Sequence, residues 1–203
     1  MTAEIMHDPT LNGEVTRSAA FGTAPPPPLA SGRPPALDHY DVSRPFQYSQ
    51  QQFRSVLGQF ASGVAVVTAT NGESTEGMTI QSFCSLSLDP PLVLLCPARS
   101  STSWPRIESM GQLCVNILAV GQETVARQFA RTGPNKFEGI AWSQSEHTGS
   151  PILDGALAWL DCRIVREFDG GDHFIVVCEV HAFASHADLK PLLFFQSAFS
   201  GIV

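Results

Sequence analysis

Charged residues are scarce in this chain of 203 residues. They make up 15% of the sequence, against about a quarter in an average soluble domain, whereas hydrophobic residues make up 43%. This balance excludes a wholly disordered chain and indicates much buried surface, which can include a subunit interface. The net charge is −7, so a nucleic-acid partner is not expected.

Long apolar runs are also absent from the sequence. No segment approaches the roughly 18–20 apolar residues that cross a bilayer. The N-terminal sequence MTAEIMHDPTLNGE has neither the basic segment nor the apolar segment of a secretory signal. We therefore expect a cytoplasmic protein with no membrane partner.

Cysteine pairs of the CxxC type are missing as well. The number of cysteines is odd and all of them lie in apolar, strand-like segments, which argues against a disulfide framework and against a zinc site. Histidines and carboxylates do not occur at metal-ligand spacing either, so no metal is expected. We expect free thiols that pack as small hydrophobic side chains. The five cysteines are Cys84, Cys96, Cys114, Cys162 and Cys178.

The composition changes near residue 45. Residues 1–45 hold eight of the fifteen prolines and show no periodic apolar pattern. We interpret them as a disordered, polyproline-like tail, with a Pro-rich ligand for a partner protein as the alternative. The folded domain is predicted over residues 46–203.

The folded domain is predicted to be mainly β with a few peripheral helices. Ser49 and Gln52 have the spacing of a capping box, and apolar residues follow at i, i+3, i+4 and i+7 from Phe53, which predicts a helix. Two further helices are expected near 102–110 and 123–130. About seven strands with hairpin-like links indicate a small β-barrel, and periodicity leaves a sandwich open. The predicted strands are 64–70, 77–88, 90–97, 113–118, 157–168, 173–185 and 191–195.

The first candidate site is a run of hydroxyl residues between the predicted strand 90–97 and Trp104. Arg99 precedes the four successive hydroxyl residues of 100–103. A helix that begins here would offer free backbone N–H groups, and hydroxyls with one guanidinium would complete an anion site, with phosphate as the expected ligand. The alternative is ordinary capping of the helix by serine and threonine.

The second candidate site is the sequence Asp169-Gly170-Gly171-Asp172-His173 between two predicted strands. The two glycines permit a tight reversal of the chain. The carboxylate of Asp172 can hold the neighbouring imidazole in one tautomer. The alternative is a hairpin tip with an exposed histidine. The sequence has no GxSxG, P-loop or GxGxxG motif, which disfavours those mechanisms.

Several segments together resemble the short-chain flavin reductases, the NAD(P)H:flavin oxidoreductase components of two-component monooxygenases. Their order and spacing carry the resemblance, which extends from Phe53 to the C-terminus. It is strongest to the reductase subunits of phenol hydroxylases and of the seco-steroid type, through QSF-x-x-LSL-x-PPLVL-x-CP and DGGDHF. The segments are FRSVLGQFASGVAVVT, QSFCSLSLDPPLVLLCP, SxSW at 101–104, LCVNIL, KFEGI, GDHFIVV and PLLFF.

The resemblance implies an FMN-binding split β-barrel that forms a homodimer. It also implies hydride transfer from NADH, with NADPH less expected, to FMN or FAD. The reduced flavin would diffuse to a monooxygenase that acts on an aromatic substrate, a steroid-derived phenol in the relatives of the seco-steroid type. A non-catalytic flavin-storage protein on the same barrel is the alternative, and a barrel like pyridoxamine-phosphate oxidase is a further one.

The resemblance also implies which residues form the site. In the family, the segment that corresponds to 78–85 lines the flavin ring and ribityl chain. His173, with Asp172, would lie beside the nicotinamide, where we expect it to position the ring rather than transfer a proton. Phe199 stands where many relatives have tyrosine. The flavin would contact the side chains of Thr79, Gln81, Ser82 and Ser85, the backbone of Met78, Ile80 and Cys84, the strand end Cys96-Pro97-Ala98, and, through its phosphate, Ser101 and Ser103.

Overall fold

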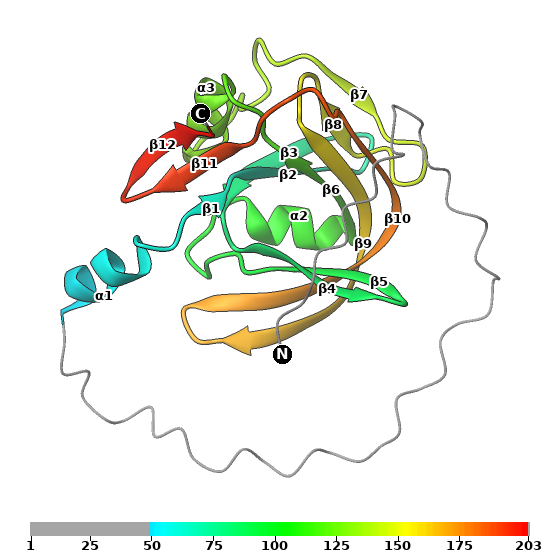
Figure 1. Ribbon diagram of the computed structural model, residues 1–203. Coiled ribbons are helices and arrows are strands. Elements are labelled where there is room, and N and C mark those ends of the chain that lie inside the picture. The colour runs from blue at the N-terminus through cyan, green and yellow to red at the C-terminus, as the bar shows by residue number, and fades with distance from the viewer. Residues whose placement is uncertain (1–48, 203) are drawn as a thin grey trace.

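The computed structural model describes residues 49–202, so the predicted tail over 1–45 lies outside the described residues. Most of the described chain belongs to a strongly curved seven-stranded sheet with the strand order β3-β2-β6-β9-β10-β5-β4 (Figure 1). All neighbouring strands in it are antiparallel. The strands are β2 (Ala65–Thr70), β3 (Thr75–Ile80), β4 (Phe83–Leu88), β5 (Pro91–Leu95), β6 (Gln112–Ile117), β9 (Ala158–Gly170) and β10 (His173–Ser185).

The two edge strands of this sheet are consecutive in the chain and meet at a corner. Only Gln81 and Ser82 separate β3 from β4, so the sheet curls into a barrel whose seam passes through them. The Ser82 hydroxyl fixes the corner to the end of β5, because Oγ donates to the carbonyl oxygen of Cys96 (2.9 Å) and accepts from its N–H (3.1 Å). The single strand predicted over 77–88 is thus wrong: the structure breaks it at this corner.

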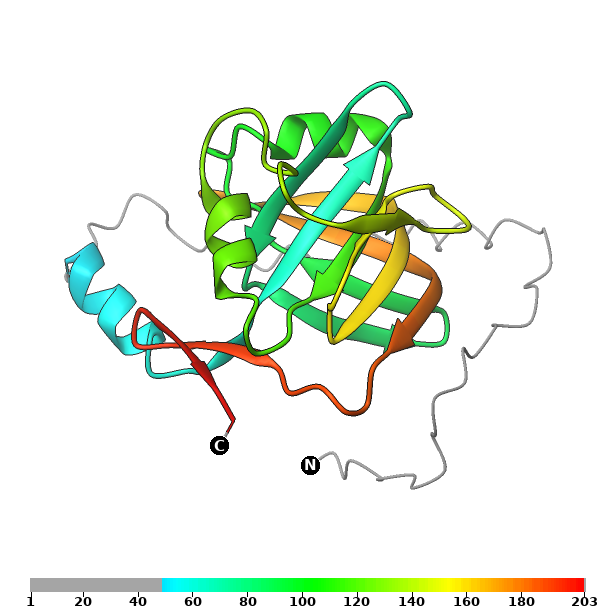
Figure 2. The ribbon, with the colours of Figure 1, turned by 90° about the horizontal axis from the view of Figure 1, so that it is seen from above.

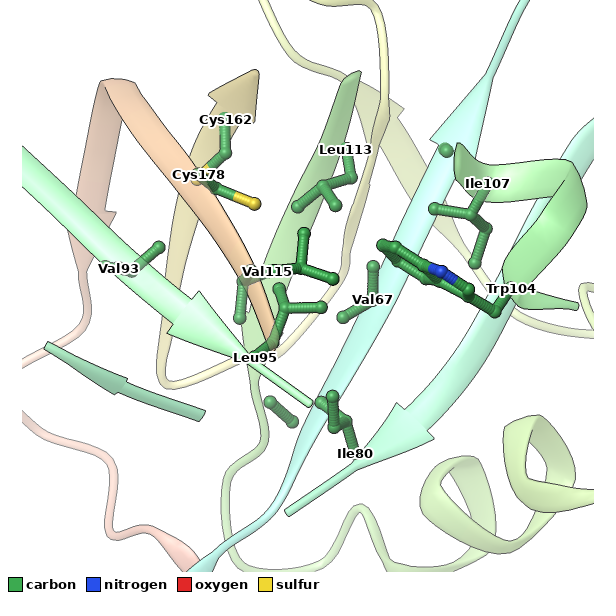
Figure 3. Packing of buried hydrophobic residues seen from close by; sticks show 13 residues of the cluster. Val67, Ile80, Val93, Leu95, Trp104, Ile107, Leu113, Val115, Cys162 and Cys178 are labelled. Atoms are coloured by element: carbon green, nitrogen blue, oxygen red, sulfur yellow. The ribbon is translucent and has the colours of Figure 1, made fainter. Parts of the chain in front are cut away.

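Helix α2 (Trp104–Met110) lies within the curve of the sheet, close to the predicted helix at 102–110. Its Trp104 and Ile107 are fully buried and face apolar side chains of β2 and β6 (Figure 3). The indole Nε1 of Trp104 donates to the carboxylate of Glu167 at 3.1 Å, which satisfies the one polar atom of this side chain. The helix therefore closes the interior of the barrel.

Helix α3 (Glu123–Ala130) matches the predicted helix at 123–130 and packs on β2 and β3 from outside the barrel. Ala126 and Phe129 form its buried face. They belong to a second apolar cluster that also contains Val66 of β2 and Leu192. Gly77 of β3 is buried beneath the Phe129 ring, where an added Cβ would lie 2.5 Å from a ring carbon. The α3 packing therefore depends on the absence of a side chain at that position.

Helix α1 (Gln50–Leu57) stands off the barrel beside a small sheet (Figure 2). The predicted capping box is confirmed, since Ser49 Oγ accepts from Gln52 N–H and the Gln52 side chain accepts from Ser49 N–H. Its C-terminal end is joined to the tip of the hairpin at 192–201 by a hydrogen bond from Gln196 N–H to Gly58 O (3.0 Å). The small sheet has the order β1 (Ser62–Gly63), β11 (Leu192–Phe195) and β12 (Ala198–Gly201).

Four short strands were not predicted. They are β1, β12 and the pair β7 (Trp142–Gln144) and β8 (Pro151–Leu153), which forms a separate ribbon. Each has four residues or fewer, so none is long enough to show alternation. None of the helices within residues 49–202 is long and apolar enough to span a membrane.

The cysteines follow the prediction only in part. All five are free, and Cys114, Cys162 and Cys178 are buried as expected. Burial raises the pKa of the Cys178 thiol to about 12, which keeps it protonated and unreactive. Cys84 is exposed and Cys96 is half-buried, because they alternate with the core-facing Phe83 and Leu95 on β4 and β5. The expectation of core packing was wrong for these two.

Candidate functional site

Three contacts bring the predicted site segments together at the barrel seam. Ser82 of the corner binds the backbone of Cys96. The strand end continues to Ala98, which forms an isolated antiparallel bridge with His173. On the other side of the corner, the Ser101 hydroxyl lies 3.8 Å from the sulfur of Met78 on β3. Residues that are almost a hundred positions apart in sequence thus form one surface.

The corner presents both polar side chains and unpaired backbone. Strand β3 pairs only with β2, and β4 only with β5, so within the described residues the outer N–H and C=O groups of both strands have no partner strand. A row of free backbone donors and acceptors is a ready binding edge for a planar heterocycle. The predicted residues exposed here are Gln81, Ser82, Cys84 and Ser85.

Two predicted residues at the end of β3 have other partners for their side chains. Ile80 is buried in the barrel core, so only its backbone faces the seam, as the resemblance implied. The Thr79 hydroxyl donates to the carbonyl oxygen of Ala126 on α3 at 2.6 Å. It therefore ties β3 to α3, and its oxygen keeps only acceptor capacity for a ligand.

The strand end 96–98 and the turn between β9 and β10 are joined through their backbones. Phe174 N–H donates to Pro97 O (3.0 Å), and Arg99 N–H donates to Asp172 O (2.9 Å). These bonds flank the Ala98–His173 bridge. The strand end and the turn are therefore held as one unit.

The turn itself orients the imidazole of His173. Gly171 has φ of +82°, a left-handed conformation that glycine adopts without strain. His173 Nδ1 lies 2.7 Å from Asp172 Oδ1, and this hydrogen bond holds the pKa of the Asp172 carboxyl below its usual value. With a neutral imidazole, Nδ1–H donates to the carboxylate and Nε2 remains as the free nitrogen. The contact predicted between these two residues is confirmed.

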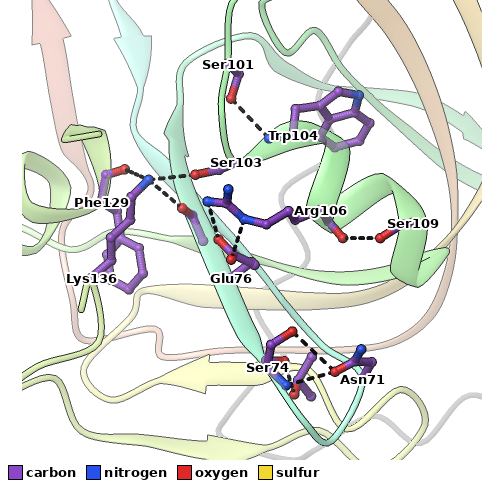
Figure 4. Close-up of polar contacts among 12 residues, drawn as sticks. Asn71, Ser74, Glu76, Ser101, Ser103, Trp104, Arg106, Ser109, Phe129 and Lys136 are labelled. Atoms are coloured by element: carbon purple, nitrogen blue, oxygen red, sulfur yellow. Dashed lines mark hydrogen bonds and ion pairs between the residues drawn. The ribbon is translucent and has the colours of Figure 1, made fainter. Parts of the chain in front are cut away.

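The serines of the hydroxyl run at 100–103 have different partners in the structure. Ser101 Oγ accepts from Trp104 N–H at 3.1 Å (Figure 4), whereas the N-cap residue of α2 is Ser103. Ser103 is 2% exposed and accepts from the ammonium of Lys136 at 2.8 Å. Its side chain makes no capping hydrogen bond. Ser101 is thus the more accessible of the two predicted phosphate contacts.

Lys136 is a residue of this region that the sequence reasoning missed. Its ammonium also donates to Gly77 O (3.0 Å) and Phe129 O (3.3 Å), so it ties β3, α2 and α3 together (Figure 4). Burial lowers the pKa of this ammonium. It lies in the segment KFEGI that contributed to the resemblance, and that segment was the available signal. A cleft of about 470 Å³ lies beside it, lined in part by Glu76, Thr102, Arg106 and Pro134.

Arg99 does not supply the guanidinium that was predicted for the hydroxyl run. Its Nε donates to Gly171 O at 2.8 Å, and its Nη2 lies 2.9 Å from Asp169 Oδ1. The guanidinium also lies over the Phe174 ring, 4.2 Å from its centroid. The side chain therefore belongs to the β9–β10 turn.

Phe199 lies on β12, in the small sheet. It packs edge-to-face against Phe194 with ring centroids 5.2 Å apart, and the Arg127 guanidinium of α3 lies 4.9 Å from its centroid. Among the described contacts, none joins it to the corner. Its assignment to the flavin site stays a prediction.

Comparisons with known proteins decide the family. The model of the flavin reductase like domain matches residues 57–202, which is most of the chain. The chain belongs to the flavin reductase like family. The match covers every segment of the site described above.

Relatives in this flavin reductase like family are well above 30% identical. The flavin-dependent monooxygenase reductase subunit HsaB of Mycobacterium tuberculosis is 45% identical over 158 residues, which cover 77% of this chain and 84% of the relative. The FMN reductase (NADH) SmoA of Agrobacterium fabrum is 41% identical over 151 residues, 74% of this chain and 85% of the relative.

Solved structures of flavin reductases have the same fold. Nitrilotriacetate monooxygenase component B from Mycobacterium thermoresistibile is 46% identical with a TM-score of 0.73, over 76% of this chain and 87% of that chain. The NADH:FAD oxidoreductase SgcE6 of Streptomyces globisporus, solved with NAD and FAD fragments, is 37% identical with a TM-score of 0.73. That match covers 76% of this chain and 93% of SgcE6.

Proposed function

We propose that this protein is an NADH-dependent flavin reductase that reduces FMN or FAD and supplies the reduced flavin to a partner monooxygenase. The observation that carries the proposal is the backbone connection between the barrel seam and the His173 turn, because hydride transfer needs two rings held face to face. Relatives named as NADH-dependent FMN and FAD reductases support it, as do relatives named as reductase subunits of monooxygenases.

The residues at the seam fit a flavin ring. The pyrimidine side of a flavin alternates oxygen acceptors with an N–H donor, and the free backbone of β3 and β4 offers the complementary groups. Gln81 and Ser85 add exposed side-chain donors and acceptors, whereas the Ser82 hydroxyl already donates to Cys96 O and keeps only acceptor capacity. Backbone N–H groups at this edge would stabilise the negative charge that grows on the pyrimidine side during reduction.

The flavin phosphate is assigned to the accessible hydroxyl of Ser101. Its oxygen accepts from Trp104 N–H, and its proton is directed at the Met78 sulfur at 3.8 Å, a weak acceptor that an anion would replace. Ser103 contributes indirectly, because its hydroxyl accepts from the Lys136 ammonium and holds that side chain close to the same loop. One half-buried hydroxyl, with the nearby Arg99 and Arg106 already paired to carboxylates, suits the moderate affinity that a diffusible product requires.

His173 is proposed to position the nicotinamide. The flavin supplies the redox chemistry by accepting at N5 the hydride that leaves nicotinamide C4. Asp172 fixes the imidazole orientation, which leaves Nε2 free to contact the substrate. This step needs no strong protein acid, so we assign His173 a binding contact rather than a proton transfer.

The dinucleotide is proposed to be NADH rather than NADPH. The turn carries two exposed carboxylates, Asp169 and Asp172, and its nearest guanidinium is already paired with Asp169. This acidic rim would repel the extra 2′-phosphate of NADPH.

The active species is proposed to be a homodimer. Core-facing residues of β5 and β10 alternate with apolar residues that point outward, so this outer face carries Leu92, Leu94, Ile175 and Val177. Cys84 of β4, which is paired with Leu94, continues the face, and Leu86 and the 91% exposed Leu88 are further exposed apolar residues of the same edge strand. A contiguous apolar patch on an otherwise polar surface is typical of a subunit interface.

The partner is proposed to be a flavin-dependent monooxygenase that acts on an aromatic substrate, and the HsaB relatives favour one derived from a steroid. The reduced flavin reaches it by diffusion. Residues 1–45 are proposed to form a separate tail that the reductase reaction does not need. Deleting them should leave kcat/KM within twofold, and loss of flavin reduction would instead assign the tail to the site.

The test is NADH oxidation by the purified full chain, followed at the nicotinamide absorbance band with added FMN or FAD. We expect turnover that needs free flavin and falls when NADPH replaces NADH. His173→Ala should lower kcat/KM for NADH about tenfold, in line with the loss of one positioning contact. The flavin dissociation constant, read from fluorescence quenching, should stay within twofold.

The main competing function is flavin storage on the same barrel. A storage protein would bind flavin and fail to oxidise NADH, and that result would withdraw the nicotinamide role of His173. The Asp172–His173 hydrogen bond beside the strand end favours the reductase, because storage has no use for an oriented imidazole there.

A further inference from the structure

We propose that Arg99 is a positioning residue, which holds the Gly171–His173 turn against the strand end that carries the flavin. The inference rests on the proposed function, since it concerns how His173 meets the nicotinamide. Arg99 itself follows directly after the 96–98 strand end, so it links the two halves of the site through one side chain.

The Arg99 side chain makes three contacts with the turn and the residue that follows it. Its Nε donates to Gly171 O (2.8 Å), its Nη2 pairs with Asp169 Oδ1 (2.9 Å), and its Cζ lies over the Phe174 ring, 4.2 Å from the centroid. The planar guanidinium can meet all three partners at once, whereas an ammonium offers neither the fork nor the stacking plane. An isolated surface ion pair would contribute little, so the value of this contact lies in the geometry that it fixes.

Asp169 completes the arrangement from the other side of the turn. The same Oδ1 accepts from Gly171 N–H at 2.9 Å. That hydrogen bond and Arg99 lower the pKa of the Asp169 carboxyl, which keeps it ionised at neutral pH. Both polar groups of the Gly171 backbone are therefore occupied, its N–H by Asp169 and its carbonyl by Arg99.

The turn needs such a restraint because it contains two adjacent glycines. Gly170 and Gly171 have the widest conformational freedom of any residues, and Gly171 adopts a positive φ. The β9–β10 ladder reaches Gly170, which pairs with His173, and the backbone bonds of Asp172 and Phe174 hold the chain after the turn. Gly171 lies between these restraints and is held by Asp169 and Arg99. Without the Arg99 side chain, the Gly171 carbonyl loses this partner, and the peptide that leads into Asp172 and His173 is less firmly oriented.

The experiment compares Arg99→Met, Arg99→Lys, Asp169→Asn and the double variant Arg99→Met/Asp169→Asn with wild type in NADH:flavin turnover. Arg163→Met is the matched control, because Arg163 is exposed on β9 and six residues before Asp169, about 20 Å along the strand. KM for NADH, kcat and the flavin dissociation constant are measured for each, together with the melting temperature.

We expect Arg99→Met to lower kcat/KM for NADH about tenfold or more, as small misplacements of reacting groups do. The flavin dissociation constant should stay within twofold. Arg99→Lys should retain part of the activity, and Arg163→Met all of it. The double variant should be no worse than Arg99→Met alone, since both changes remove one interaction.

Two results would overturn the inference. In the first, wild type is active and Arg99→Met keeps kcat/KM for NADH within twofold. In the second, Arg99→Met weakens flavin binding as much as NADH use and lowers the melting temperature, which would make Arg99 a general structural residue. Absence of NADH oxidation in wild type itself would count against the proposed reductase function instead.

Discussion

At the scale of single residues, Gly77 sets how closely α3 approaches the barrel. An added Cβ would lie 2.5 Å from the Phe129 ring, which is fully buried and packs edge-to-face on Phe137 at 4.9 Å between centroids. The ring has no space into which it can withdraw. A residue chosen only for strand propensity would not be glycine, so packing decides this position.

Gly77→Ala should therefore lower the free energy of unfolding by about 1–3 kcal/mol, the usual cost of overpacking a core. The clash outweighs the smaller gain expected when alanine replaces glycine within a strand. Urea denaturation measures the change. Gly63→Ala is the matched control, because its Cβ would meet nothing within 4 Å. Equal stability of the two variants would contradict the packing explanation.

A second residue-scale prediction concerns acid stability at Asp169. The folded state lowers the pKa of this carboxyl from its ordinary 3.8, through Gly171 N–H first and Arg99 second. Ionised Asp169 therefore stabilises the fold above about pH 3.8, and the contribution is lost as the pH falls through the lower folded-state pKa. The stability difference between wild type and Asp169→Asn should shrink from pH 6 to pH 3.

Urea denaturation at each pH checks this sign. Asp188→Asn is the control, since it removes an exposed carboxylate on another loop. A difference for Asp169→Asn that grows toward acid pH would show that the carboxyl is not held in its ionised form by the turn.

At the scale of elements, the corner between β3 and β4 explains which parts of the site the sequence predicted. The polar residues of 78–85 were recognised because hydroxyls and an amide stand out in an apolar context. The break at Gln81-Ser82 was missed, because neither glycine nor proline marks it and alternation continues through it. What makes it a corner is the bond from Ser82 to Cys96, and this long-range contact has no local signature.

The same limit applies to the charged groups of the site. The local pair Asp172–His173 was predicted, since adjacent residues can be read directly from the sequence. Arg99 was assigned to the hydroxyl run beside it, but its partners Asp169 and Gly171 lie some seventy residues away. Lys136 was missed for the same reason. Tertiary contacts decide which partners the cationic side chains bind, and the residue types alone do not reveal these partners.

Ser82→Ala should loosen the corner and weaken flavin binding. The hydroxyl makes two hydrogen bonds to Cys96, and the loss of such a pair corresponds to about tenfold in affinity. Fluorescence titration with FMN measures it, while KM for NADH at saturating flavin should change less than twofold. Ser109→Ala, whose hydroxyl donates only within α2, is the control. Unchanged flavin affinity in Ser82→Ala would remove the corner from the proposed site.

At the scale of the whole molecule, the low content of charged residues is reflected in the apolar outer face of β5 and β10. The scarcity of charge predicted much buried surface, which can include a subunit interface. The outward apolar residues of β5 and β10 would be buried in the proposed dimer. The helical spacing in α1 predicted an amphipathic helix correctly. Its apolar residues Val56 and Leu57 are nevertheless exposed, because α1 stands off the barrel (Figure 2) and none of its residues is buried within the described part of the chain.

Wild type should elute as a dimer in size-exclusion chromatography with light scattering, with twice the mass of one chain. Leu88→Glu should shift it toward the monomer, because a charge buried at an interface without a partner is costly. Leu189→Glu places the same charge on an exposed apolar residue of another loop and should leave the dimer intact. A monomeric wild type would contradict the proposed assembly.

The exposed Cys84 gives this outer face a chemical consequence. Its Cα is paired with Leu94, which in turn is paired with Val177, so the thiol lies in the proposed contact face. Cys114, Cys162 and Cys178 are buried, and Cys96 is half-buried with a pKa raised by burial. Cys84 is thus the cysteine that a maleimide can alkylate most readily. If the proposed dimer covers it, the rate of its labelling reports the rate at which the subunits dissociate.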